Sequence, residues 1–177
     1  MIVVVMVFSA VLAVTIQTAL PAWGFLGGAK LPFLMAVVLY YALTRERGMA
    51  LAVGALAGVL QDALSFVPMG YSSAVFCGLA LFAGLFRDVV MTESPLTAAL
   101  FGAGGGLLAT LASYLLLAHA GQAPAFGLRI AWKLAGSAGT GALVAPVTLA
   151  TLRGLDRLLG MVPVRRTPID DEANAYL

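Results

Sequence analysis

Long apolar runs alternate with short polar or turn-forming segments along the whole chain. A helix that crosses a bilayer needs about 20 predominantly apolar residues, and charged clusters and Gly/Pro breaks divide this sequence into six candidates of that kind. The pattern predicts an all-α bundle of six transmembrane helices, with Pro146 interrupting the last of them, followed by a polar tail. The predicted spans cover residues 2–20, 31–43, 49–66, 71–86, 95–118 and 130–152, and the tail covers 153–177.

The composition points to the same class of protein. Of the 177 residues, 62% are hydrophobic and 10% are charged, whereas an ordinary soluble domain is about 25% charged and about 45–50% apolar. A soluble domain of this length could not hide that much apolar surface, because small domains bury only about two-thirds of theirs. We therefore expect one integral membrane domain. The N-terminal run carries no basic residue, which favours an uncleaved first helix over a cleaved signal peptide.

The distribution of Lys and Arg predicts the orientation, since the cytoplasmic flanks of membrane spans collect these residues. With six spans, one side holds seven of them and the other side three, which places both termini in the cytoplasm. The second span is short: its 13 residues rise only about 20 Å, against about 30 Å for the hydrocarbon core. It could extend upstream, thin the bilayer or be re-entrant, and we favour a full crossing. The seven basic residues on the predicted cytoplasmic side are Arg45, Arg47, Arg87, Arg153, Arg157, Arg165 and Arg166. The three on the other side are Lys30, Arg129 and Lys133.

Asp62 places a carboxylate inside the third apolar run, near its predicted outer end. At about 100° per residue, a set of small and polar residues shares one helix face, with Asp62 at its border. A Gly-x-x-x-Gly spacing lets two helices approach closely in lipid, and an ionisable residue within a span usually faces protein or a cavity. We favour a buried structural or partner-contact role over a carboxylate that reaches headgroup water, and over a proton relay. The small and polar residues that share this face of the third span are Gly54, Gly58, Gln61 and Ser65.

A Pro-x-Gly turn, from Pro68 to Gly70, follows the third span and predicts a tight external connection. So short a connection makes the third and fourth spans antiparallel neighbours, with residues 71–73 at the level of Asp62. These residues could supply hydrogen bonds to the carboxylate and so hold the loop and the two helix ends together. Two other stretches, Gly102–Gly106 and Gly136–Gly141, are rich in small residues. They predict close helix contacts, either inside the bundle or with another membrane protein.

The sequence predicts no catalytic, cofactor or metal site. One cysteine and one histidine are too few for a His/Cys metal site, and the glycine-rich runs lack the lysine of a phosphate-binding loop. Asp62 has no second intramembrane aspartate for a protease dyad. A net charge of +2 does not suggest nucleic acid as a partner. Arg129 and Lys133 could contact lipid headgroups or an anionic ligand, although we favour snorkelling for both.

The segment from Lys30 to Asp88 resembles the MreD family, the rod shape-determining membrane proteins of bacteria. Its sequence is KLPFLMAVVLYYALTRERGMALAVGALAGVLQDALSFVPMGYSSAVFCGLALFAGLFRD. The shared features are a proline that opens the second span, a short basic loop, a Gly-x-x-x-Asp ending of the third span, the Pro-x-Gly turn and a closing arginine. Many members carry an acidic residue after the first proline, whereas this chain has Phe33 there, which is a departure from the family's pattern. The positions that match the family's motif are Gly58, Asp62, Pro68, Gly70 and Arg87.

The resemblance implies a non-enzymatic scaffold of the cell-wall elongation machinery in the bacterial inner membrane, acting in rod shape determination and lateral peptidoglycan synthesis. The implied partners are the single-span protein MreC and, through the assembly, the MreB filament and RodA with its class B penicillin-binding transpeptidase. The family's fold is similar to the S-components of energy-coupling-factor vitamin transporters, which implies an outward-facing cavity that holds a partner's helix. The alternative is an S-component-like subunit that binds a small molecule, with Trp23 and Tyr71 as candidate contacts.

Overall fold

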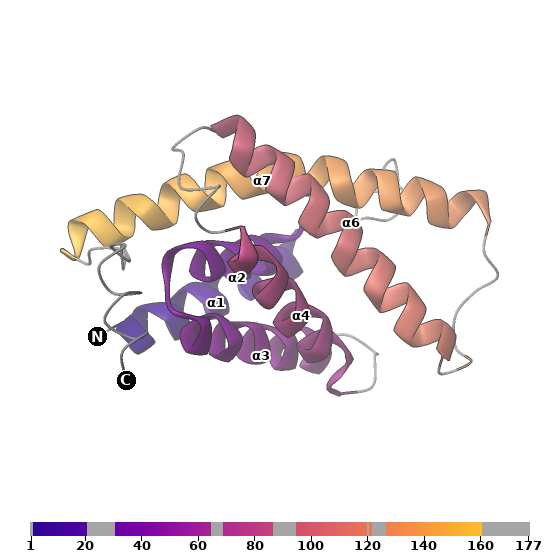
Figure 1. Ribbon diagram of the computed structural model, residues 1–177, viewed down its shortest axis with the longest axis horizontal. Helices are drawn as coiled ribbons and strands as arrows, with labels where there is room; N and C mark the ends of the chain where they lie inside the picture. The colour runs from indigo at the N-terminus through magenta and orange to yellow at the C-terminus, as the bar shows by residue number, and fades with distance from the viewer. Residues whose placement is uncertain are drawn as a thin grey trace, which may run out of the picture.

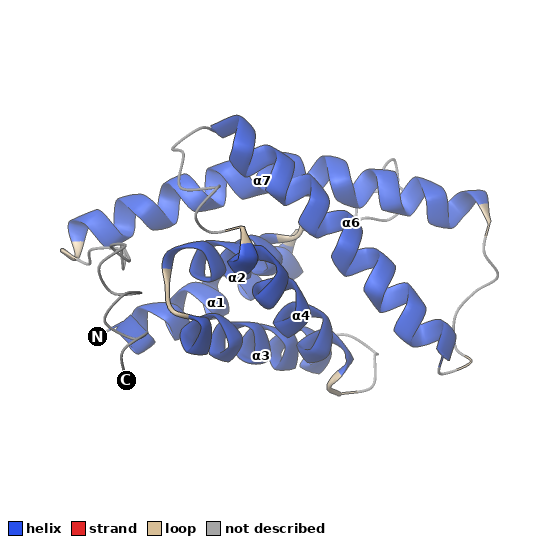
Figure 2. Ribbon diagram, viewed as in Figure 1, coloured by secondary structure: helices blue, strands red, loops and turns tan. Residues whose placement is uncertain are grey.

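The computed structural model describes residues 2–20, 31–64, 69–86, 95–119, 121 and 127–160. The regular secondary structure in these residues is helical throughout, which confirms the predicted all-α class, as Figure 1 and Figure 2 show. The helices are α1 (Ile2–Ala19), α2 (Phe33–Thr44), α3 (Arg47–Ala63), α4 (Tyr71–Leu85), α6 (Pro95–His119) and α7 (Leu128–Leu158).

Three of these helices, α1, α6 and α7, are long and apolar enough to cross a membrane. The apolar helices α2 and α4 are shorter. Many large hydrophobic side chains remain exposed on the outside of the bundle, among them Val4 on α1, Leu96 on α6 and Val147 on α7. Exposed apolar surface of this extent suits lipid as the solvent, so the molecule has the character of an integral membrane protein.

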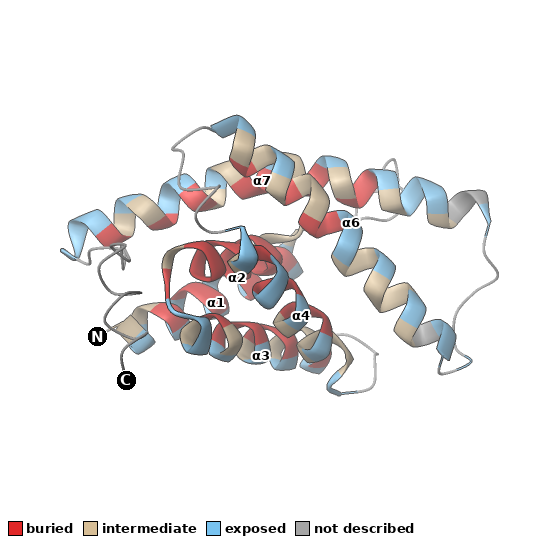
Figure 3. Ribbon diagram, viewed as in Figure 1, coloured by how far each residue is buried: buried red, intermediate tan, exposed pale blue. Residues whose placement is uncertain are grey.

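The central helix is α2, which contacts every other described helix. Ten consecutive residues, Leu34 to Leu43, are buried on all sides, and Figure 3 shows the helix in red at the heart of the bundle. A helix that is apolar all round is one that is surrounded by protein or lipid, and here protein surrounds it. The short second span of the sequence is therefore the core of the fold. Its first residue, Phe33, packs against that core.

The remaining helices pack mainly as two pairs, α3 with α4 and α6 with α7. In Figure 1 the α6–α7 pair lies across a unit formed by α1, α2, α3 and α4, and the second half of α6 diverges from α7. We call the end where α2 stops and α3 starts the arginine end. It contains Arg45 and Arg47, together with Arg153 and Arg157 from the last turns of α7.

The last helix differs from its prediction in two respects. It contains Pro146 in its interior and continues to Leu158, whereas the sequence predicted an interruption at Pro146 and a polar tail from position 153. Both predictions are corrected. A proline is tolerated within a membrane helix where neighbouring groups satisfy the freed carbonyl. The helix extends because Leu152 and Asp156 are buried against the rest of the bundle, so these residues belong to the fold.

Candidate functional site

Asp62 lies in the last turn of α3 with only 3% of its surface exposed. Its carboxylate accepts hydrogen bonds from the backbone N–H groups of Gly70, at 2.7 Å, and Ser72, at 3.2 Å. The first N–H groups of a helix have no partner within that helix, and a negative charge is favourable beside them. Asp62 therefore caps α4 from the end of the neighbouring helix.

Gly70 makes this cap geometrically possible. It directly precedes α4 and has a φ of 102°, in the left-handed region that glycine enters at little cost and other residues rarely adopt. The backbone turns there so that the N–H groups of Gly70 and Ser72 both point at the Asp62 carboxylate. The hydrogen bonds to Asp62 come from the backbone of the residues that open α4.

Gly54 and Gly58 both face α4. A Cβ atom on Gly58 would overlap the backbone of Ser73 and lie 2.6 Å from its hydroxyl, and one on Gly54 would lie 3.0 Å from the carbonyl oxygen of Phe76. The close approach lets the Ser73 hydroxyl donate a hydrogen bond of 3.3 Å to the carbonyl of Ala55. The Gly-x-x-x-Gly face is thus occupied within the chain, where it brings α3 and α4 together.

Gln61 belongs to a junction of three helices. The side-chain amide of Gln17 on α1 donates to the side-chain oxygen of Gln61 on α3 at 2.9 Å. The side-chain oxygen of Gln17 accepts from the backbone N–H of Leu34, in the first turn of α2, at 3.2 Å. Sequence reasoning gave Gln17 no role, although an amide in an otherwise apolar first span was an available signal. The other predicted site residues, Ser65, Pro68 and Arg87, lie outside the described residues.

A buried ion pair at the arginine end was missed by the sequence analysis. Arg45, which directly follows α2, donates from Nη2 to Oδ2 of Asp156 on α7 at 2.7 Å. The Tyr40 hydroxyl donates to the same oxygen at 2.6 Å. Arg45 and Asp156 are 2% and 5% exposed, so each compensates a charge that would be costly to bury alone. The sequence analysis had assigned Arg45 to a cytoplasmic loop and position 156 to the tail.

The small residues of α6 and α7 pack against one another. A Cβ on Gly102 would overlap the carbonyl oxygen of Gly141, and one on Gly106 would overlap the carbonyl oxygen of Ser137. The Ser137 hydroxyl donates to the Gly106 carbonyl at 3.3 Å. Of the two alternatives that the sequence left open for Gly102, Gly106 and Gly141, contact inside the bundle is therefore the one that the structure shows.

A cavity of about 330 Å³ lies between the α1–α4 unit and the α6–α7 pair, towards the end opposite the arginine end. Polar side chains reach it from both sides. Those from the first unit are Gln17, Gln61 and Ser72, and those from the second are Thr110, Ser113, Tyr114, Lys133 and Ser137.

Two apolar grooves continue from this cavity between α4 and α6. The first has a volume of about 510 Å³ and shares Val75 and Ala109 with the cavity. The second, of about 200 Å³, shares Leu79, Phe82 and Leu108 with the first. The cavity and the two grooves therefore adjoin one another along α4 and α6, and polar side chains line the cavity whereas the grooves are lined by apolar residues.

These features define the class of the protein: an all-helical integral membrane protein whose intramembrane polar groups mainly hold helices together. Within the described ranges, no group of three His, Cys, Asp or Glu is placed to hold a metal ion. The family model of the rod shape-determining protein MreD matches residues 1–121, and the chain belongs to the MreD family. The resemblance found in the sequence is thereby confirmed, and with it a role in rod shape determination. Comparison with curated proteins and with solved structures finds no match.

Proposed function

We propose that the chain is a non-enzymatic scaffold of the bacterial cell-wall elongation machinery, which binds MreC and helps to organise MreB and RodA with its class B penicillin-binding transpeptidase. Family membership supports the role in cell shape. The observation that carries the scaffold function is the surface made by the adjoining cavity and grooves between α4 and α6. The close contacts of Gly54, Gly58, Gly102, Gly106 and Gly141 are made within the chain, whereas this surface offers a second protein a place to dock.

The dimensions of this surface suit a single-span partner. One turn of an α-helix with its side chains, about 10–12 Å wide and about 5.4 Å long, fills a cylinder of roughly 420–610 Å³. The cavity has a volume of about 330 Å³, which is less than the volume of one such turn. The adjoining apolar groove has a volume of about 510 Å³, which is about the volume of one turn. A partner helix would therefore lie along α4 and α6 in the membrane, with one end in the polar cavity.

The proposal includes six membrane crossings with both termini in the cytoplasm, in a bundle similar to the S-components. It is supported by the positions of the basic residues, because cytoplasmic flanks collect Arg and Lys. Arg45, Arg47, Arg153 and Arg157 lie at the arginine end, whereas Lys133 lies near the other end of α7. The cavity then faces outward, away from the cytoplasm.

Affinity purification from native membranes tests this proposal. We expect the tagged wild type to recover a single-span MreC-like protein together with wall synthases. Gly78 lines the apolar groove, and a Cβ there would meet nothing within 4 Å, so Gly78→Leu adds a side chain at the groove from a position where its Cβ meets no neighbour and should reduce recovery. Gly139 on α7 is equally open but lines neither groove, so Gly139→Leu serves as the control. Equal recovery with all three proteins would refute the docking surface.

The alternative function is that of a small-molecule-binding subunit of an energy-coupling-factor transporter. The observation that favours it is the cavity itself, since about 330 Å³ falls at the lower end of the range of about 300–1,000 Å³ for ligand pockets. The same purification distinguishes the two functions. Recovery of paired cytoplasmic ATPases with a second multispan subunit, together with saturable vitamin binding, would establish the transporter function and contradict the scaffold.

A further inference from the structure

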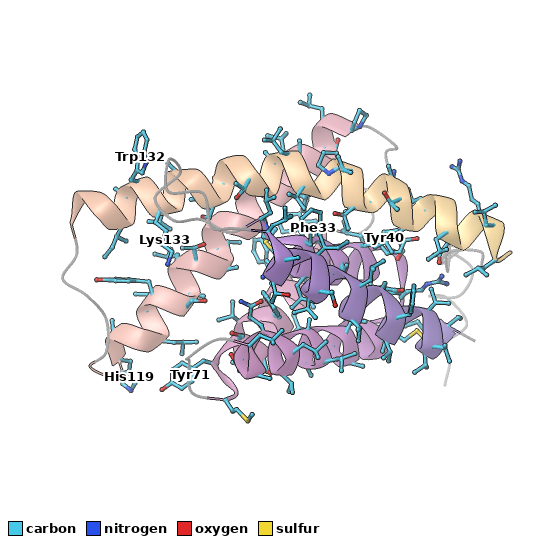
Figure 4. The ribbon with its side chains drawn as sticks, turned by 180° about the vertical axis from the view of Figure 1, so that it is seen from behind. Phe33, Tyr40, Tyr71, His119, Trp132 and Lys133 are labelled. Atoms are coloured by element: carbon cyan, nitrogen blue, oxygen red, sulfur yellow. The ribbon has the colours of Figure 1, made fainter. Side chains whose placement is uncertain are left out.

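Lys133 brings a positive charge to the wall of the cavity. Of the described residues that line the cavity, it is the only Lys, Arg, Asp or Glu. Figure 4 shows its side chain directed into the space between α7 and α6, whereas the neighbouring Trp132 points away from the bundle. Trp132 is 55% exposed and suits the membrane interface, where aromatic rings gather. Trp132 therefore lies on the outside of α7, whereas Lys133 faces the cavity.

No acidic side chain in the described part of the chain pairs with Lys133. The one ion pair among these residues joins Arg45 to Asp156 at the arginine end. Asp62 lies beside the cavity, next to the lining residue Gln61, but its carboxylate is held by the N–H groups of Gly70 and Ser72. Within the described residues, the ammonium group that Lys133 brings to the cavity therefore has no counter-charge.

An empty cavity leaves this ammonium in contact with water, but a docked segment would remove the water. Sealing a charge without a counter-charge is strongly unfavourable. We infer that the partner segment that fills the cavity carries an Asp or Glu whose carboxylate pairs with Lys133. This inference rests on the proposed function and names the chemistry by which the same surface recognises its partner.

The rest of the cavity wall favours a peptide over a lipid headgroup. In that wall the Ser113 hydroxyl donates to the Ala109 carbonyl at 2.7 Å, so its oxygen remains an acceptor, and the Thr110 hydroxyl can both donate and accept. A peptide backbone also does both, whereas an ionised phosphate only accepts. A peptide with a carboxylate therefore satisfies Lys133, and its backbone N–H groups can donate to these two hydroxyl oxygens, which an ionised phosphate cannot do.

Zero-length cross-linking tests the inference in the intact complex. A carbodiimide joins an amine to a carboxylate that touches it, so treatment of native membranes should link Lys133 to an acidic residue of the single-span partner, identified by mass spectrometry of the joined peptides. Among variants, Lys133→Glu should lower partner recovery about tenfold or more, Lys133→Met should lower it less, and Lys133→Arg should retain it. The matched control is Arg153→Glu, the same reversal on the same helix at the arginine end.

Each outcome decides between the proposals. If the wild type recovers no single-span partner, the proposed function fails. If the wild type recovers the partner and Lys133→Glu recovers it equally well, only the pairing with Lys133 is refuted. Loss of a co-purifying phospholipid from Lys133→Met, with unchanged partner recovery, would overturn the inference in favour of a lipid. Thermal unfolding of each purified variant in detergent shows whether the fold is retained, and Lys133→Arg provides the folded comparison.

Discussion

The Arg45 guanidinium and the Asp156 carboxylate form a buried ion pair of 2.7 Å although the two residues lie 111 positions apart in the sequence. The pair ties the end of the central helix α2 to the last turn of α7. The Tyr40 hydroxyl donates a hydrogen bond to the same carboxylate oxygen of Asp156. The α1–α4 unit and the α6–α7 pair are thus joined by charge at the arginine end, while the cavity separates them towards the other end.

We expect Asp156→Ala to destabilise the bundle by about 3–5 kcal/mol, because it removes the carboxylate that pairs with the buried Arg45 guanidinium. The measurement is thermal or denaturant unfolding of the purified protein in detergent. Arg153→Ala is the control on the same helix, since Arg153 is only partly buried and makes no ion pair with a described residue. Its expected effect lies within about 0.5 kcal/mol.

The double variant Arg45→Met with Asp156→Leu should recover most of that loss, because it removes both buried charges together. Tyr40 then loses its acceptor, so recovery should be incomplete, by about 1–3 kcal/mol for one unsatisfied hydroxyl. A double variant as unstable as Asp156→Ala would show that the ion pair is not the source of the stability.

Close packing of α3 on α4 predicts that Gly58→Ala is destabilising. The added methyl group would overlap the Ser73 backbone, and overpacking of this kind costs about 1–3 kcal/mol. Gly104→Ala is the matched control in α6, since a Cβ there meets nothing within 4 Å. It should be neutral or stabilising by up to about 1 kcal/mol, the difference in helix propensity between the two residues. Equal effects of the two substitutions on the unfolding midpoint would contradict this packing.

The local sequence pattern was sufficient to predict that α3 and α4 pack side by side. The spacing of Gly54, Gly58 and Asp62 puts them on or beside one helix face, and the turn before Tyr71 forces the next helix alongside it. The close approach of these helices and the hydrogen bonds to Asp62 therefore follow from residues within about one helical hairpin. That the donors are backbone N–H groups depends on the left-handed conformation of Gly70, which no residue pattern specifies.

The contacts between distant segments could not be predicted in the same way. Arg45 and Asp156 each look like a charged flank in the sequence, and only the packing of α7 against α2 brings them together. The extension of α7 to Leu158 also results from this packing, since Leu152 and Asp156 in its last turns are buried against the rest of the bundle. The cavity depends on how far the second half of α6 diverges from α7, and that angle is set by packing rather than by any motif.

The left-handed conformation of Gly70 predicts that Gly70→Ala destabilises the protein. At a φ of 102°, a Cβ atom is strained even though nothing lies within 4 Å of it, and the cost is about 1–2 kcal/mol. Gly70→Asn should cost less, since asparagine tolerates this region better. Gly48→Ala in the first turn of α3 is the control, because its Cβ also meets nothing and its φ is not positive. An unfolding midpoint of Gly70→Ala equal to that of Gly48→Ala would contradict the cap geometry.

Asp62 offers a way to separate a structural role from contact with a partner. Asp62→Ala removes the acceptor for both N–H groups and should cost about 1–3 kcal/mol, and Asp62→Asn, which keeps one acceptor oxygen, should cost less. Each variant is expressed in place of the wild type in a rod-shaped host, and cell shape is compared with the unfolding midpoint of the purified protein. If Asp62 acts as the cap of α4, loss of rod shape should follow the loss of stability across the two variants. Gly58→Leu disrupts the same helix contact without changing the carboxylate, and its loss of rod shape should follow its loss of stability in the same way. Loss of rod shape in Asp62→Asn at wild-type stability would show instead that the carboxylate is needed by a partner.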